Sequence, residues 1–327
     1  MDDGGDNNIF VFLGGNQEVP SRVVTHAIID PSVKIVRRRA FYRRYVLVSI
    51  IFHDGVEIIE TEAFYNCESL SGRVKLLGVR EIGYRAFDGC LALSDVEFGD
   101  RLETIGNRAF RYCNSLRSIK IPSVRTVHAH AFRNCWQLRD VEFGIDLERL
   151  GFNSFSDCEH LWRIVIPLKD NLFPIDTNEQ QYNQFEGCGN LTTVDIVGAE
   201  GIHKTVSSFI IESWRDEMIE VIGRINRELP NTYADEKTNA IRLWIRSVIN
   251  RLEHYKAEHN RLLKEHMTLL ELAIWKAKLD EREDDDSTQR VQRKRAKIDV
   301  KSSREEKRIT SGADIIIKNV LPFLKLG

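Results

Sequence analysis

The chain has 327 residues, of which 42% are apolar and 29% are charged, a balance typical of a soluble protein with room for two domains. Its net charge of −2 predicts no overall attraction to nucleic acid or to a membrane surface. Because the longest apolar runs are far shorter than a membrane span and the acidic residues 1–8 do not resemble a secretory signal, we expect an intracellular protein, cytoplasmic or nuclear, without membrane contact.

The first expected element is an N-terminal cap in residues 1–23. Its apolar run is residues 9–13 (IFVFL), which Gly14 and Gly15 end. A stack of repeats leaves the core of its first repeat open, so a degenerate leading strand is needed to cover it. An imperfect repeat follows around Phe41.

A unit of about 23 residues then fills residues 24–205. Its core is Phe-x-x-Cys-x-x-Leu, and the spacing between successive phenylalanines is 23, 23, 22, 23 and 30 residues. All six cysteines of the chain occupy the same slot of this unit. The six copies contain Phe64, Phe87, Phe110, Phe132, Phe155 and Phe185. This period predicts a stacked solenoid, and the longest step predicts a loop inserted within residues 168–181.

The stretch from Leu116 to Cys135 (LRSIKIPSVRTVHAHAFRNC) resembles the BspA-type leucine-rich repeat. The resemblance covers roughly residues 24–197. It implies an α/β fold in which a leucine-rich-repeat solenoid carries one parallel sheet. It also implies a binding scaffold with diverse partners and no shared catalytic residue.

Alternating apolar residues within each repeat predict a short strand whose apolar side chains point inward. The outward residues should then form columns along the stack. One column contains Lys75, Glu97, Lys120 and Glu142, whose alternating charges favour a salt-bridge ladder over a site for a charged ligand.

The neighbouring outward columns contain a candidate partner-binding site. Arg117, Arg139, Trp162 and Arg163 are expected to lie together there. Arginine and tryptophan are over-represented among the residues that dominate binding energy at protein interfaces. The alternative is a solvated face with the tryptophan packed under the inserted loop.

A second basic patch flanks the phenylalanines. Arg85, Arg108 and His130 come two residues before a phenylalanine, and Arg111 and Arg133 come one residue after. This stripe is either solvated surface that balances nearby carboxylates or a site for phosphate or an acidic partner.

The sequence carries no pattern of catalytic, metal or cofactor sites. The cysteines lack the C-x-x-C pairs of zinc sites, and their inward slot predicts buried free thiols. His128 and His130 form a His-x-His pair without a third ligand at a suitable spacing. No nucleophile elbow, phosphate loop or dinucleotide fingerprint is present, so we expect neither an enzyme nor a cofactor.

After Gly201 the apolar spacing changes to threes and fours, which predicts a helical hairpin or coiled coil over residues 206–283. The second of these helices carries a stripe from Ile245 to Ala273 over four heptads. Its partner could be the first helix, the end of the solenoid, the closing apolar segment or a second copy of the chain. The oligomeric state is open, with a slight preference for the monomer.

Residues 284–327 are expected to form a basic linker and an apolar C-terminal segment at 314–326. A cluster in the linker resembles a nuclear-import signal. It consists of Arg293, Lys294, Arg295 and Lys297.

The leading interpretation is a non-enzymatic protein-interaction scaffold whose repeat face binds a protein of open identity. The alternative is a nuclear protein that contacts nucleic acid through the basic arm and the arginine stripe. The net charge argues against nucleic acid, as does an apparent lack of aromatic residues between the basic ones.

Overall fold

The computed structural model of the chain describes residues 9–15, 19–174 and 183–292, with side chains described as far as residue 279. The expected import cluster, the closing apolar segment and most of the inserted loop lie outside these residues. The chain divides into two compact units, one of residues 1–207 with 216–251 and the other of residues 208–215 with 252–327. Each unit is described by itself.

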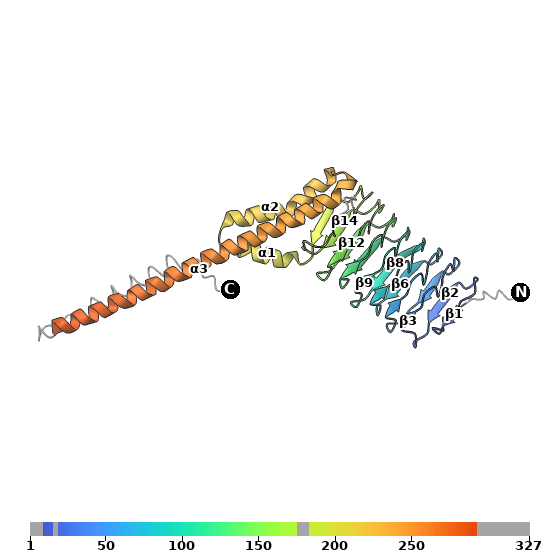
Figure 1. Cartoon of the computed structure of the whole chain (residues 1–327), viewed down its shortest axis with the longest axis horizontal. Coiled ribbons are helices and arrows are strands. Elements are labelled where there is room, and N and C mark those ends of the chain that lie inside the picture. Colours follow the sequence, from blue (N-terminus) through green and yellow to red (C-terminus); the bar gives the residue numbers. More distant parts are fainter. Residues whose placement is uncertain (1–8, 16–18, 175–182, 293–327) are drawn as a thin grey trace. The chain divides into compact units, whose positions relative to one another are not determined.

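The repeats form a solenoid in which each repeat makes one turn, here called a rung. All strand pairs are parallel, and Figure 1 shows the strands stacked in chain order from β1 to β14. The strands of the main face are β1 (Ile9–Phe12), β2 (His26–Ile29), β4 (Ser49–Ile51), β6 (Gly72–Leu76), β8 (Leu93–Phe98), β10 (Ser118–Ile121), β12 (Asp140–Phe143), β14 (Arg163–Ile166) and β15 (Thr193–Ile196).

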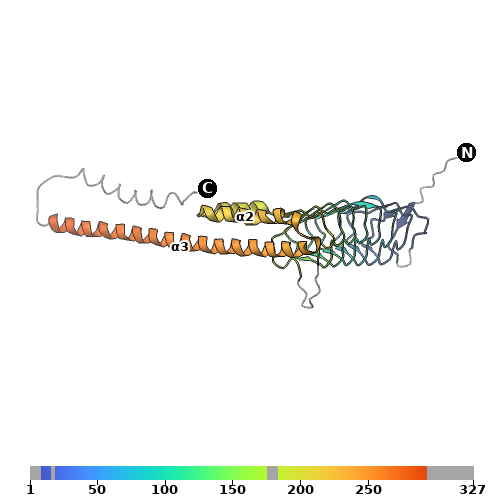
Figure 2. The same ribbon diagram turned by 90° about the horizontal axis from the view of Figure 1, so that it is seen from above.

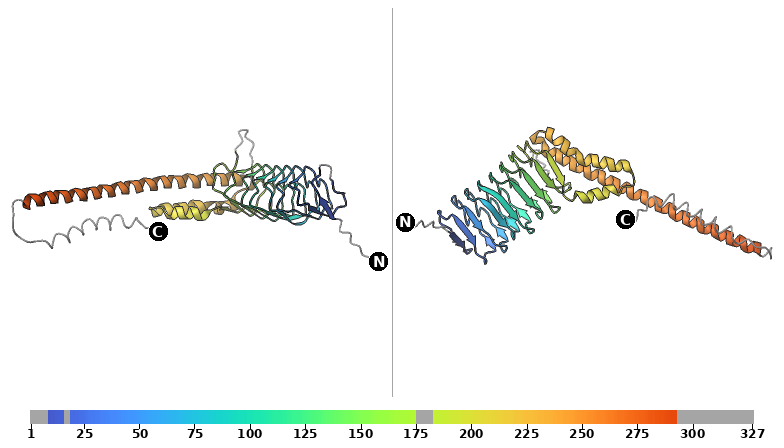
Figure 3. Two further views of the ribbon diagram at one scale, coloured as in Figure 1. Left: turned by 90° about the horizontal axis from the view of Figure 1, so that it is seen from below. Right: turned by 180° about the vertical axis from the view of Figure 1, so that it is seen from behind.

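A second ladder of two-residue strands runs along the stack, where the sequence predicted a single sheet. It forms because a buried apolar residue in each rung alternates with an exposed or half-buried one. Its strands are β3 (Ile35–Val36), β5 (Ile58–Ile59), β7 (Glu81–Ile82), β9 (Thr104–Ile105), β11 (Thr126–Val127) and β13 (Arg149–Leu150). Figures 2 and 3 show the coils of successive rungs in register.

The turns that carry the phenylalanines are also bonded from rung to rung. The amide of Phe64 donates to Ala86 at 2.7 Å, and the amide of Phe87 donates to Ala109 at 2.7 Å. Residues two positions before and after the phenylalanine take left-handed backbone angles, as Arg85 does with a φ of 53° and Tyr112 with a φ of 59°. That conformation costs free energy for a residue other than glycine, so the hydrogen bonds between rungs must hold it in place.

The core is a continuous ladder of phenylalanines and cysteines. Neighbouring phenylalanine rings stack with centroids 5.0 to 5.3 Å apart from Phe41 to Phe155, and 6.0 Å apart at Phe185. Each cysteine thiol donates to the carbonyl of the phenylalanine one rung earlier, as Cys113 does to Phe87 at 3.3 Å. All six cysteines are buried free thiols, as the sequence predicted.

The first rung is covered at its N-terminal end by β1. The Phe12 ring lies 5.4 Å from the Phe41 ring, and both side chains are buried. The strand pairs with β2 in parallel, so it extends the main sheet by one strand.

The last rung is closed by the start of the long helix α3 (Lys237–Gln292). The buried ammonium of Lys237 donates to the carbonyls of Gly189 at 2.7 Å and Leu191 at 2.6 Å. The Thr238 hydroxyl accepts the amide of Phe185 at 3.2 Å. These side chains satisfy backbone groups that would otherwise have no neighbouring rung to bond with.

Two further helices precede α3. They are α1 (Ala199–Ser207) and α2 (Glu212–Glu228), and short 3-10 turns at Leu229–Asn231 and Ala234–Glu236 lead from α2 into α3. In the first unit α2 packs along the start of α3, where the Trp244 indole donates to the Val221 carbonyl at 3.0 Å (Figure 2). α3 is longer than predicted because its helix continues through the acidic residues 280–286.

In the second unit, an aromatic cluster begins the outer part of α3. Trp214 stacks on Tyr255 at 5.0 Å, and Phe209 meets Tyr255 edge-on at 6.0 Å. Further along, the stripe is largely exposed, with Leu269 at 62% and Trp275 at 67%. The coiled coil and the oligomeric state therefore stay predictions.

Candidate functional site

Arg117, Arg139 and Trp162 lie on consecutive rungs at the edge of the main sheet, as predicted. The amide of Arg139 donates to the Arg117 carbonyl at 2.8 Å, and the amide of Trp162 donates to the Arg139 carbonyl at 3.0 Å. The backbone thus fixes the three residues in one row, which we call the arginine–tryptophan column. Each of the three residues directly precedes a strand of the main sheet, β10, β12 or β14, and each is exposed.

The column is available to a partner. Both arginines are exposed, and neither guanidinium has an ion pair with any residue that the structure describes. The Trp162 side chain is 47% exposed, so a large apolar surface stays in contact with water. The inserted loop, under which Trp162 would pack in the alternative interpretation, lies mostly outside the described residues.

Arg163 lies beside the column but is engaged within the sheet. Its guanidinium binds Asp140 at 2.9 Å and Asp195 at 2.7 Å. Burial lowers the pKa of this arginine, while the two carboxylates raise it, and the net direction is upward. Arg163 therefore reinforces the strand pairing and offers less charge to a ligand than Arg117 or Arg139.

The predicted salt-bridge ladder forms in two places on the sheet. Lys75 lies 3.7 Å from Glu97, and Lys120 lies 2.8 Å from Glu142. Val165 then takes the next position in the column and is buried. These charges are paired between neighbouring rungs. The arginines of the arginine–tryptophan column differ from them because they have no ion pair among the described residues.

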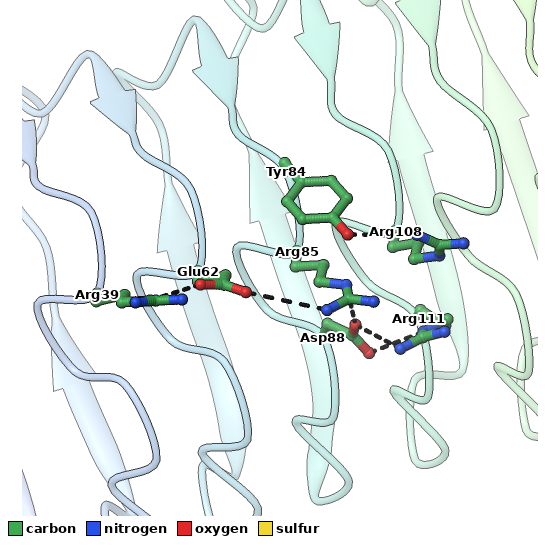
Figure 4. Close-up of polar contacts among 7 residues, drawn as sticks. All are labelled: Arg39, Glu62, Tyr84, Arg85, Asp88, Arg108 and Arg111. Atoms are coloured by element: carbon green, nitrogen blue, oxygen red, sulfur yellow. Dashed lines mark hydrogen bonds and ion pairs between the residues drawn. The ribbon is translucent and has the colours of Figure 1, made fainter.

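The second basic patch is an alternating chain of charges (Figure 4). Asp88 is almost fully buried, and its two carboxylate oxygens accept hydrogen bonds from the Arg111 guanidinium at 3.1 and 2.9 Å. The Arg85 guanidinium lies 3.4 Å from the same carboxylate. Glu62 lies between Arg39 at 2.6 Å and Arg85 at 4.0 Å. Much of the positive charge predicted here is therefore balanced by carboxylates of neighbouring rungs.

The rest of the second patch differs from residue to residue. Arg108 donates to the Tyr84 hydroxyl at 3.3 Å, and Arg133 lies 3.4 Å from Asp157. Burial, and then the nearby Arg108 and Arg133, hold the pKa of His130 below its usual value. The imidazole is thus neutral near pH 7, and it adds no charge to the patch.

Tyrosines lie between the arginines of this surface, contrary to the expectation that aromatic residues are missing there. Tyr42 stacks on Tyr65 at 5.2 Å, and the Arg85 guanidinium lies 5.0 Å from the Tyr84 ring. Aligning the repeats on their phenylalanines would have shown this, since Tyr42 and Tyr65 occupy the same slot.

Nothing within the described residues points to catalysis. No group of three histidine, cysteine, aspartate or glutamate side chains is placed there to hold a metal. Burial raises the pKa of Cys67 to about 12 and raises that of the other five thiols as well, so none is a reactive thiolate. Among the same residues, no helix is long and apolar enough to cross a bilayer.

A parallel solenoid with a repeated phenylalanine and cysteine core is a repeat protein of the leucine-rich class. The chain belongs to the BspA type leucine rich repeat family, whose model matches it in six copies over residues 34–162 and 80–208. Proteins of this family are generally surface or interaction repeats, and the scaffold is generally non-enzymatic.

Solved structures of similar proteins come from bacteria. A leucine-rich repeat protein of T. pallidum is 23% identical, with 58% of this chain and 76% of that chain covered and a TM-score of 0.37. One from Bacteroides ovatus is 24% identical over 54% of this chain and 61% of that chain, with a TM-score of 0.36. The pneumococcal vaccine antigen PcpA is 19% identical over 57% and 66%, with a TM-score of 0.32. No curated protein matches the chain.

Proposed function

We propose that this protein is a non-enzymatic scaffold that binds a protein partner through the arginine–tryptophan column of its main sheet. One observation carries the proposal. Arg117, Arg139 and the half-exposed Trp162 stand in a row on a rigid sheet, beside charges that are already paired with each other.

The chemistry of the column fits a protein surface. A tryptophan supplies a large apolar contact, and an arginine supplies both hydrogen bonds and a flat apolar face. The hydrogen bonds between rungs fix the backbone from which these side chains extend, so no backbone conformational entropy is lost when the partner docks. A partner with an apolar pocket and carboxylates at its rim would complement them.

The partner is sought by quantitative affinity capture from native cells with the tagged full-length chain. The variant Arg139→Gln/Trp162→Ser removes one cation and the tryptophan of the column. We expect it to lose the partner by about thirtyfold or more, since truncation of such interface residues costs roughly 2 kcal/mol.

The matched control is Lys75→Gln/Trp275→Ser, which also removes one cation and one exposed tryptophan, but away from the column. The control should retain the partner. Loss of the same protein from the control, with retention by the column variant, would refute the proposed site.

The proposed setting is intracellular. Six buried free thiols are compatible with the reducing conditions of the cytoplasm or nucleus. The proposed activity needs no cofactor or metal, because recognition by the column depends on contact area, charge and hydrogen bonds alone.

A further inference from the structure

The turns that carry the phenylalanines form a second continuous surface, here called the turn face. It consists of residues 37–44, 60–65, 83–89, 106–112 and 128–134. Backbone hydrogen bonds join each segment to the next, as from Arg39 to Thr61 at 3.1 Å and from Arg85 to Asn107 at 3.0 Å. Phenylalanine rings 5.0 to 5.3 Å apart underlie it, so five rungs extend over roughly 20 Å.

The turn face has a strong excess of arginine. Its nine arginines are Arg37, Arg38, Arg39, Arg43, Arg44, Arg85, Arg108, Arg111 and Arg133. Its three carboxylates are Glu60, Glu62 and Asp88, and it contains no lysine. A local field of this kind can attract anions although the whole chain has a net charge of −2. The exclusive use of arginine favours ligands with planar or tetrahedral oxyanions, which its forked guanidinium binds through two hydrogen bonds.

The carboxylates leave several of these arginines unpaired. Glu62 and Asp88 are occupied by arginines on either side of them, and a Glu60 oxygen accepts the backbone amide of Arg38 at 2.7 Å. Arg37, Arg38 and Arg43 are exposed and have no ion pair with any residue in the described part of the chain. The free positive charge is therefore concentrated on the first rung.

Tyrosines hold the arginines in position. The guanidiniums of Arg39 and Arg43 lie 5.1 and 5.2 Å from the Tyr42 ring, and that of Arg111 lies 4.9 Å from the Tyr112 ring. Cation–π contacts of this kind restrict long side chains before a ligand arrives, which lowers the entropy lost on binding. Tyr84 and Tyr112 are partly exposed, so part of each side chain is open to a ligand, although the Tyr84 hydroxyl already accepts a hydrogen bond from Arg108.

We propose that the turn face binds single-stranded nucleic acid. The strand would run along the rungs, with phosphates on Arg37, Arg38, Arg43 and Arg108 and bases against the exposed parts of the tyrosines. Arginine and tyrosine together along a straight track are the combination that proteins use for single strands, in which every nucleotide brings one phosphate and one aromatic base. An acidic peptide would use the arginines but would bring no aromatic bases to the exposed tyrosine rings.

This inference goes beyond the proposed protein-binding function, because the turn face and the arginine–tryptophan column occupy different segments of each repeat. One solenoid could therefore hold a protein and a nucleic acid at the same time. If the test of one surface fails, the proposal for the other surface still stands.

The test is fluorescence anisotropy of labelled 15-nucleotide oligo-dT and oligo-U with the full-length chain. Three or four phosphate contacts would lower the affinity about 20- to 50-fold between 50 and 200 mM NaCl. Arg37→Gln/Arg38→Gln should lower the affinity about tenfold at 50 mM NaCl and make it less dependent on salt. Unchanged thermal melting would show that the variant is folded.

The control is Arg101→Gln/Lys204→Gln, which also removes two exposed positive charges, outside both the turn face and the column, and should bind the oligonucleotides as the wild type does. The proposal is overturned if no binding occurs at 50 mM NaCl, or if both double variants bind like the wild type, which would assign binding to the basic arm after residue 290. A labelled peptide of 15 glutamates distinguishes a site for nucleic acid from a site for acidic proteins. If it binds as tightly as the oligonucleotides and is lost with Arg37→Gln/Arg38→Gln, the turn face is a site for acidic proteins and the nucleic-acid proposal is wrong.

Discussion

At the scale of single residues, the phenylalanine slot forms the close-packed centre of the solenoid. Phe110 is fully buried between Phe87 and Phe132, with ring centroids 5.2 and 5.3 Å away. We predict that Phe110→Ala lowers the free energy of unfolding by roughly 3 to 5 kcal/mol in urea denaturation. Phe41→Ala should cost nearly as much because Phe12 covers that ring. A loss below about 1 kcal/mol at Phe110 would be inconsistent with a close-packed ladder.

A second prediction at this scale concerns His130, whose pKa is lowered by burial and by nearby arginines. The folded chain binds a proton there less readily than the unfolded chain. Stability from the neutral imidazole is therefore present above the ordinary histidine pKa of about 6.5 and is lost as the pH falls through the lowered value. His130→Asn, which suits the left-handed backbone there as Asn153 does one rung later, should lose less stability than wild type between pH 7 and pH 5. If urea titrations show that the variant and the wild type lose the same stability between pH 7 and pH 5, this role is disproved.

At the scale of elements, the start of α3 acts as the cap of the last rung. Lys237→Met keeps the apolar stem but leaves the carbonyls of Gly189 and Leu191 without their donor. We predict a loss of about 1 to 3 kcal/mol in the free energy of unfolding, because each buried acceptor then lacks a partner. Lys75→Met, at an exposed and weakly paired position, should change it by less than about 0.5 kcal/mol. Similar values for the two variants would mean that the helix does not cap the solenoid.

The elements also show what a sequence can predict. A strict repeat places residues in columns, so Arg117, Arg139 and Trp162 were correctly assigned to neighbouring positions. The same columns contain Arg111 and Asp88, which occupy one slot of neighbouring repeats, so the expected balance by nearby carboxylates could have been assigned to this pair. The cap was beyond reach, since Lys237 contacts residues 46 and 48 positions earlier and no period relates them.

At the scale of the whole molecule, the outer stripe of α3 needs cover. Leu269 and Trp275 are exposed on this helix. An amphipathic helix whose apolar stripe stays in water gains little stability from packing. We predict that the closing apolar segment at residues 314–326 provides this cover, so that light scattering finds a monomer for the full chain. Truncation after Asp286 should then cause association. A full-length dimer that is unaffected by the truncation would instead indicate an intermolecular coiled coil.

The most direct test of the scaffold account is site-specific photo-cross-linking in native cells. A photoreactive phenylalanine analogue replaces Ser118, an exposed residue beside Arg117 of the column, or Arg80, an exposed residue paired with Glu103 outside the column. The account predicts that position 118 forms an adduct with one partner protein, the same one that affinity capture finds, and that position 80 does not. Adducts from position 80 alone, or the same set of proteins from both positions, would contradict it.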